Sequence, residues 1–251
     1  MTDAGPVTGA PPAADDAGPG TRLWLVRHGH TEWTESGRVA GRTDVALSDR
    51  GREAVRALGP TLGAELAAAR TAGRHALWWT SPASRARETA TLLLEGASAS
   101  GAGSAPAPRE DARLVELDFG DWEGSTWEAV HRDHGERLAR WGEDWVDGAP
   151  PNGESFRAQA ARASAWLDDA LAAGREAGGE SACDLFAIAH GGTIRALLAV
   201  VLGHALERAM RFRVDPASVA CAERVAGTDG GPGRWLLRLS NAAGFDLTPD
   251  A

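Results

Sequence analysis

Three short segments of this 251-residue chain together supply histidine, arginine and glycine residues that suit phosphate chemistry. The first holds Arg27 and His28, the second holds Arg85, and in the third His190 precedes Gly191. Planar guanidinium groups bind phosphate oxygens in pairs, and the free amides at a helix start attract anions. A neutral imidazole held among such groups can attack phosphorus and form a phosphohistidine. The three segments therefore predict a site for a phosphate group.

Cleavage of a phosphate ester also needs an acid, because the alkoxide that leaves must take up a proton. A segment rich in carboxylates and apolar residues, 114–124, contains two candidates. Glu116 is the preferred acid, and Glu123 is the alternative.

Apolar runs that alternate with helical patterns place these residues in a fold. The runs at 23–26, 76–79 and 183–189 predict buried strands, helical patterns cover 48–70, 81–94 and 193–202, and a hairpin joins 218–225 to 234–239. In the second helix, Pro82 is expected in the first turn. This order predicts an α/β fold of three layers, α/β/α, with a mostly parallel central sheet. Ligands bind beyond the carboxyl ends of such strands, which is where the three segments lie.

Four segments, taken in chain order, resemble the signature segments of the histidine phosphatase superfamily, also called phosphoglycerate mutase-like. They are Arg27-His28-Gly29-His30-Thr31, Ser81-Pro82 with Arg85-Ala86-Arg87, Glu116 with Phe119-Gly120-Asp121-Trp122-Glu123-Gly124, and Ala189-His190-Gly191-Gly192. The similarity extends from about residue 21 to residue 245 and implies the phosphoglycerate mutase-like fold.

The resemblance also implies a role for each matched residue. His28 is the expected nucleophile, and Arg27, Arg85 and His190 form the expected phosphate pocket. Glu116 is the expected proton donor and later the base that activates water. No metal and no cofactor are implied.

This chain departs from the family pattern at three positions. Thr34 stands where the family usually has Asn, and we assign its shorter hydroxyl to phosphate binding together with Gly191. Ala40 replaces a polar residue that would contact the substrate. Leu117 stands where a mutase would have Arg, and this difference favours hydrolysis over phosphate transfer within a substrate.

The region 127–155 is similar to the lid of α-ribazole phosphatases and of broad-specificity relatives, which agrees with the phosphatase branch that Leu117 favours. Four tryptophans lie in or beside this region: Trp122, Trp127, Trp141 and Trp145. They are expected either to line an apolar pocket for the leaving group or simply to pack the lid.

Composition excludes several other classes of function. Twenty-six arginines and no lysine exclude lysine-dependent chemistry, and a net charge of −9 opposes binding to nucleic acid or to an anionic membrane. No run of eighteen apolar residues occurs, so we expect a cytoplasmic protein without a membrane span. His30 follows His28 with the spacing of a metal-ligand pair, but no third ligand follows, so no metal site is expected.

The predicted organisation is a disordered tail at 1–20, a single domain at 21–245 and a short tail at 246–251. Within the domain, the Gly-, Ala- and Ser-rich stretch 96–108 is predicted to be a flexible surface loop. Composition does not decide the oligomeric state.

Three functions fit these observations. The leading one is a phosphomonoesterase that hydrolyses a small phosphorylated metabolite through a phosphohistidine on His28, with Glu116 as general acid and base. The alternatives are a phosphoglycerate mutase-like phosphotransferase and a domain that binds a phosphorylated ligand without catalysis.

Overall fold

A computed structural model of the chain describes residues 20–103, 106–178, 182–227 and 233–243. The predicted tails, apart from residue 20, therefore lie outside the described residues. Within these residues no helix is long and apolar enough to cross a membrane. The strands are β1 (Arg22–Arg27), β2 (His75–Thr80), β3 (Arg109–Glu110), β4 (Cys183–Ala189), β5 (Val219–Val225) and β6 (Arg234–Ala242). The α-helices are α1 (Glu32–Glu35), α2 (Asp49–Thr71), α3 (Ser84–Ala97), α4 (Trp127–Glu143), α5 (Phe156–Gly178) and α6 (Gly191–Val201).

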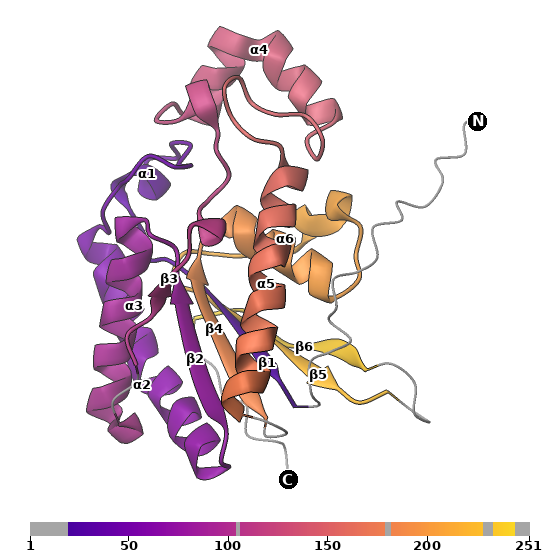
Figure 1. Cartoon of the computed structure of the whole chain (residues 1–251). Coiled ribbons are helices and arrows are strands. Elements are labelled where there is room, and N and C mark those ends of the chain that lie inside the picture. The colour runs from indigo at the N-terminus through magenta and orange to yellow at the C-terminus, as the bar shows by residue number, and fades with distance from the viewer. Residues whose placement is uncertain (1–19, 104–105, 179–181, 228–232, 244–251) are drawn as a thin grey trace.

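The strands form one sheet in the order β3-β2-β4-β1-β5-β6 (Figure 1). Strands β3, β2, β4 and β1 pair in parallel, while β5 runs antiparallel to β1 and to β6. The predicted mostly parallel sheet is confirmed, as is the hairpin at its edge. Since β1, β2 and β4 are parallel neighbours, their carboxyl ends meet at one edge of the sheet.

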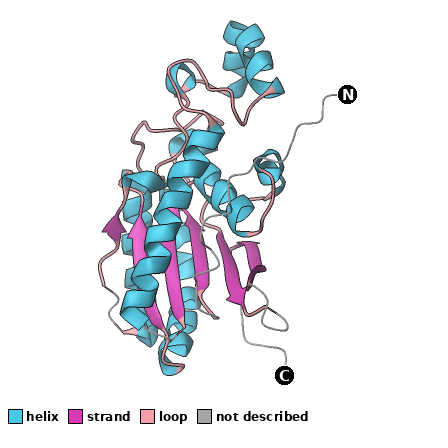
Figure 2. Ribbon diagram, turned by 45° about the vertical axis from the view of Figure 1, so that its right-hand side comes forward, coloured by secondary structure: helices cyan, strands magenta, loops and turns pink. Residues whose placement is uncertain are grey.

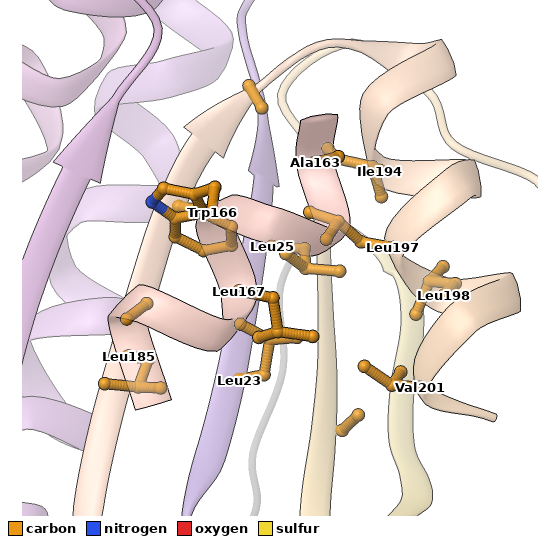
Figure 3. Close-up of a cluster of buried hydrophobic side chains, with 14 of the residues drawn as sticks. Leu23, Leu25, Ala163, Trp166, Leu167, Leu185, Ile194, Leu197, Leu198 and Val201 are labelled. Atoms are coloured by element: carbon orange, nitrogen blue, oxygen red, sulfur yellow. The ribbon is translucent and has the colours of Figure 1, made fainter. Parts of the chain in front are cut away.

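Each buried strand sends alternate side chains to opposite faces of the sheet, as the twofold period of a strand requires. On β1, Leu23 and Leu25 pack with α5 and α6, whereas Trp24 and Val26 pack with α2 and α3. Figure 3 shows the first of these faces, with side chains of both helices lying over Leu23 and Leu25. Two apolar layers therefore cover the sheet, which confirms the predicted three-layer architecture.

Three aromatic rings form a ladder across neighbouring strands on the other face. Phe186 of β4 pairs in register with Trp24 of β1 and with Trp78 of β2. Its ring centroid lies 5.5 Å from that of Trp24 and 4.0 Å from that of Trp78, and both pairs are nearly parallel. These contacts fix the relative positions of the three strands that carry the site.

Two predicted helix starts are shifted. Helix α3 begins at Ser84, with Ala83 as its N-cap, so the prediction that Pro82 occupies its first turn is wrong. Helix α6 begins at Gly191, two residues before the predicted start, because His190 is its N-cap. Both shifts bring the chemistry-bearing residues closer to the helix N-termini.

The beginning of the predicted flexible loop, residues 96–102, is helical. Helix α3 ends at Ala97 and a π-helix (Ser98–Ala102) continues it. A Cβ added to Gly59 of α2 would lie 2.8 Å from the Cα of Gly96, and one added to Gly63 would lie 3.0 Å from the Cα of Ala97. The small residues in this stretch therefore allow α2 and α3 to approach closely, a use that composition does not distinguish from flexibility.

A buried ion pair ties the start of β4 to the turn after α2. Arg74 donates from Nε and Nη2 to the carboxylate of Asp184, at 2.9 and 2.7 Å, and from Nη2 to the backbone oxygen of Gly20 at 2.6 Å. Asp184 also accepts a bond of 3.3 Å from the indole of Trp24. Removal of one partner would leave the other charge buried and uncompensated.

We expect Asp184→Ala to lower the free energy of unfolding by about 3–5 kcal/mol, since it strands the Arg74 guanidinium. Urea denaturation followed by circular dichroism measures this loss. Asp49→Ala is a matched control, because Asp49 also pairs with an arginine, Arg52, but its side chain is almost fully exposed. Equal stability of the Asp184 and Asp49 variants would contradict the assigned role of the buried pair.

Candidate active site

The carboxyl ends of β1, β2 and β4 bring the predicted residues together. The amide of His28 donates to the backbone oxygen of Ala189, and the amide of Ser81 donates to that of Ile188, at 3.0 and 2.9 Å. The centroids of the His28 and His190 rings lie 5.0 Å apart at an interplanar angle of 62°. Two histidines separated by 162 positions in the chain thus lie side by side in a buried site.

The tautomer of His28 follows from its hydrogen bond. Its Nδ1 lies 2.7 Å from the backbone oxygen of Gly29, and a carbonyl oxygen can only accept, so Nδ1 carries the proton. Nε2 then keeps its lone pair. Burial, followed by the positive charges of Arg27 and Arg85, holds the pKa of His28 well below 6.5. The ring is therefore neutral at neutral pH, as a nucleophile must be.

The guanidinium of Arg85 is held in place by backbone oxygens of the loop before α2. Nη1 donates to Thr43 at 2.9 Å and Nη2 donates to Gly41 at 2.6 Å. Burial lowers the pKa of Arg85 below its usual value. Its Nε is buried and has no hydrogen-bond partner among the described residues.

Arg27 and His190 also keep buried polar atoms without partners in the described part of the chain. Arg27 donates from Nη1 to the backbone oxygen of Val214 at 2.7 Å, but its Nε has no acceptor. His190 has a contact of 2.8 Å between Nε2 and the Ser81 hydroxyl, while Nδ1 has no partner. Burial, then the neighbouring His28 and arginines, lowers the pKa of His190 well below 6.5. Unpaired buried polar groups are costly unless a ligand satisfies them, and an anion would do so here.

Glu116 lies at the N-terminus of α6. Its carboxylate accepts from the amide of Gly192 at 3.1 Å through Oε1 and 3.0 Å through Oε2. Oε1 also accepts from the amide of Leu117 at 2.8 Å and from the side-chain amide of Gln159 at 2.9 Å. A Cβ added to Gly192 would lie 2.4 Å from Oε1, so only glycine permits this approach. The structure thus places Glu116 beside the start of the helix that carries His190.

The alternative acid, Glu123, is engaged elsewhere. Its carboxylate accepts from the amides of Arg42 and Thr43, at 2.7 and 2.8 Å, and from the Thr43 hydroxyl. A Cβ added to Gly41 would overlap this carboxylate. Because Gly41 and Thr43 also hold the guanidinium of Arg85, Glu123 orders the loop that positions this arginine.

Thr34, which we predict to bind phosphate, lies in helix α1. It lines the pocket, but its hydroxyl caps α1: Oγ1 accepts from the amide of Thr31 and donates to the oxygen of Thr31, both at 2.9 Å. Its proton is therefore already used within the helix cap. A contact with phosphate would require this bond to break.

Arg195 is a pocket residue that we did not predict. It follows Gly191 by four residues on α6, so the two share one face of the helix, a spacing that was visible in the sequence. Its Nη1 would lie 3.0 Å from a Cβ added to Gly191, and its Nε donates to the oxygen of Phe212 at 3.0 Å. Burial lowers its pKa below the usual value.

A cavity of about 690 Å³ opens beside these residues. Arg27, Glu116, Gly191, Gly192 and Arg195 are among the residues that line it. The lining also contains aromatic side chains, namely Phe119, Trp127, Trp141, Trp145 and Phe156. Trp122, in contrast, is fully buried and does not line the cavity.

His30 also lines this cavity. Among the described residues, no group of three or more histidines, cysteines or carboxylates has the arrangement of a metal site. The donors that meet at the site are guanidinium, imidazole and amide groups. This donor set suits an anion.

Known proteins resemble this chain in sequence and in fold. The sequence model of the histidine phosphatase superfamily (branch 1) matches residues 23–232. The adenosylcobalamin/alpha-ribazole phosphatase of Salmonella typhimurium is 31% identical over 201 residues, which are 77% of this chain and 86% of that protein. A 2,3-bisphosphoglycerate-dependent phosphoglycerate mutase of Gloeobacter violaceus is 32% identical over 176 residues, 70% of this chain and 73% of the relative.

A solved structure supports the same relationship. The mycobacterial glucosyl-3-phosphoglycerate phosphatase in complex with VO3 superposes with a TM-score of 0.70 at 28% identity, covering 88% of this chain and 99% of the other. The fold and the site define a protein of the phosphoglycerate mutase-like class. This chain belongs to the histidine phosphatase superfamily, as its signature segments predicted.

The lowered pKa values of His28 and His190 predict a loss of stability in acid. Below pH 6.5 an imidazole in the unfolded chain binds a proton, whereas the buried ring in the folded protein does not, so acid favours unfolding. Each ring contributes a slope of up to about 1.4 kcal/mol per pH unit between 6.5 and its lowered pKa. We expect His28→Gln to show a correspondingly shallower loss of stability over that range in urea titrations. Parallel curves for the variant and the parent protein would contradict the assignment.

Proposed function

We propose that this protein is a metal-independent phosphomonoesterase that acts on a small phosphorylated metabolite through a phosphohistidine on His28. The observation that carries the proposal is an imidazole with a free Nε2 lone pair beside the buried, unpartnered Nε donors of Arg27 and Arg85. A phosphoryl group would pair with these donors. The phosphatase relatives support a hydrolase of this class.

In the proposed first step, Nε2 of His28 attacks phosphorus, and a P–N bond forms as the P–O bond to the leaving group breaks. Arg27 and Arg85 bind the non-reacting oxygens, where charge collects in the transition state. Protonated Glu116 gives its proton to the leaving oxygen. The alcohol then departs through the cavity that Glu116 lines.

In the second step, the Glu116 carboxylate takes a proton from water, and the water oxygen attacks phosphorus. The P–N bond breaks, its electron pair returns to Nε2, and inorganic phosphate leaves. Glu116 is protonated again, so the cycle closes without a metal or a cofactor.

A phosphoglycerate mutase-like phosphotransferase is the second candidate, and the Gloeobacter violaceus relative supports it. Leu117 argues for hydrolysis, because it lines the cavity at the position where the family resemblance leads us to expect arginine in a mutase. An apolar side chain there offers nothing to a substrate carboxylate. Incubation with 3-phosphoglycerate separates the two: a phosphatase releases inorganic phosphate, and a mutase yields the 2-phospho isomer.

We expect His28→Ala to reduce kcat on p-nitrophenyl phosphate by about a thousandfold or more, because the nucleophile is lost. Quenched reactions of the parent protein with radiolabelled substrate should contain a protein-bound phosphate that is labile in acid and stable in base. His204→Asn is the control, since His204 is exposed and lies outside the site. Full activity of His28→Ala would refute the mechanism, and loss of parent activity in EDTA would refute metal independence.

The remaining expectations stay predictions: a small-molecule phosphomonoester as the partner, no nucleic-acid partner, and a cytoplasmic location. The net charge of −9 supports the second of these.

A further inference from the structure

Helix α4 is folded back on itself at its middle. The backbone at His134 leaves the helical region, with φ −135° and ψ 28°. Trp127 stands at the first position of α4 and Trp141 near its end, and fourteen residues of straight helix would separate them by about 21 Å. Their ring centroids are only 6.0 Å apart, at an interplanar angle of 14°. The fold-back therefore brings the two indoles together.

Two rings from the segment before α4 pack against this pair. Phe119 contacts Trp127 and Trp141 with centroids 5.7 and 6.5 Å away, and Trp122 contacts the same two rings at 6.2 and 5.5 Å, all edge to face. Trp122 is buried beneath the others. We call Phe119, Trp122, Trp127 and Trp141 the aromatic box. In Figure 2, α4 stands above the sheet, clear of the helices that cover it.

Three members of the aromatic box, Phe119, Trp127 and Trp141, line the cavity that Arg27 and Glu116 also line, while Trp122 supports them from beneath. Trp127 is 41% exposed, which leaves a large aromatic surface uncovered beside the site. The lining is also apolar at Ala40 and Leu117, where the family resemblance leads us to expect a polar residue at position 40 and, in a mutase, arginine at position 117. These side chains offer a leaving group apolar contacts rather than hydrogen bonds.

We propose that the leaving group of the substrate carries a flat aromatic ring that packs on Trp127 and Trp141. The proposal rests on the proposed phosphatase activity and adds the chemical class of its substrate. Phosphate would bind at the Arg27 end of the cavity while the ring covers the exposed indoles, which would remove apolar surface from water.

A comparison of two alkyl phosphates, one with an aromatic ring and one without, tests the subsite. Benzyl phosphate and glycerol 3-phosphate both release an alcohol, so both need the same acid. We expect kcat/KM to be about tenfold or more higher for benzyl phosphate, as one stacked ring predicts. In Trp127→Ala the ratio of the two kcat/KM values should fall about tenfold, and Trp127→Phe should restore most of it. Leu236→Ala, which removes a half-exposed side chain of β6 outside the cavity, should keep the ratio.

A binding experiment separates failure of this proposal from failure of the proposed function. Benzylphosphonate and methylphosphonate cannot be hydrolysed, and calorimetry measures their affinities without turnover. We expect benzylphosphonate to bind about tenfold more tightly, and Trp127→Ala to remove the difference. Equal affinities, or an unchanged difference in Trp127→Ala, would overturn the aromatic subsite even in an active phosphatase. Absence of all turnover with the difference in affinity intact would overturn the proposed function alone.

A separate observation concerns Gln159, a fully buried residue of α5. Its Nε2 donates to Glu116 Oε1 at 2.9 Å and to the hydroxyl of Thr193 at 3.0 Å. The Thr193 hydroxyl donates in turn to the oxygen of Val115 at 2.9 Å. This chain of bonds connects α5 and α6 to the residue next to Glu116.

The donors on Glu116 are distributed unequally between its two oxygens. Oε1 accepts from Gln159, Leu117 and Gly192, whereas Oε2 accepts only from Gly192. Oε2 therefore keeps lone-pair capacity for a proton. We infer that Gln159 is a positioning residue that turns Oε2 of Glu116 toward the reacting oxygens, an inference that also rests on the proposed acid role.

Leaving-group dependence tests this role, because a phenolate needs little help from an acid and an alkoxide needs much. We expect Gln159→Leu, which conserves the bulk of the side chain, to lower kcat/KM about tenfold for benzyl phosphate and much less for p-nitrophenyl phosphate. Glu116→Gln should show the same pattern more strongly. An equal loss on both substrates would indicate a purely structural role and overturn the inference, as would unchanged activity on both. If Glu116→Gln itself showed no such pattern, the acid role in the proposed function would fail instead.

Discussion

The arrangement of the site depends on one imidazole, His28, that is buried beside two positively charged guanidinium groups. His28 is 3% exposed, and two guanidinium groups contribute to keeping its pKa low. The backbone oxygen of Gly29 accepts a hydrogen bond from Nδ1 of this ring, and the neighbouring strand β4 fixes its backbone. Burial of the Arg27 and Arg85 guanidinium groups costs free energy, and hydrogen bonds to backbone oxygens offset part of this cost. The Nε2 lone pair of His28 and the unpaired Nε donors of Arg27 and Arg85 remain available to a ligand.

The sequence contained enough information to predict strands β1, β2, β4, β5 and β6, helices α2, α3 and α6, and the three-layer architecture, but not β3, α1, α4 or α5. Buried parallel strands are continuous apolar runs, and a glycine after a histidine marks the strand end, so His28 and His190 were recognisable from local patterns. The α6 face was equally visible, and attention to the four-residue spacing from Gly191 would have found Arg195.

Contacts between distant segments were not predictable from local patterns. Nothing near Gln159 in the sequence signals a bond to Glu116, 43 residues away. Likewise, the role of Glu123 depends on Gly41 and Thr43, whose backbone oxygens bind Arg85. Gly96 suggests flexibility until its approach to Gly59 of the neighbouring helix is known. In each case the deciding partner is far away in the chain.

The fold-back of α4 is separate in the chain from the histidines and arginines of the site. The segment that carries α4 begins after an isolated bridge between Arg38 and Thr126. It ends at Val146, whose backbone oxygen accepts from the amide of Arg157. Arg27, Arg85, His28 and His190 lie outside this segment, on the sheet edge and the helices that follow it. Substitutions confined to α4 can therefore reshape the aromatic lining of the cavity without altering the backbone bonds that hold the two histidines and two arginines.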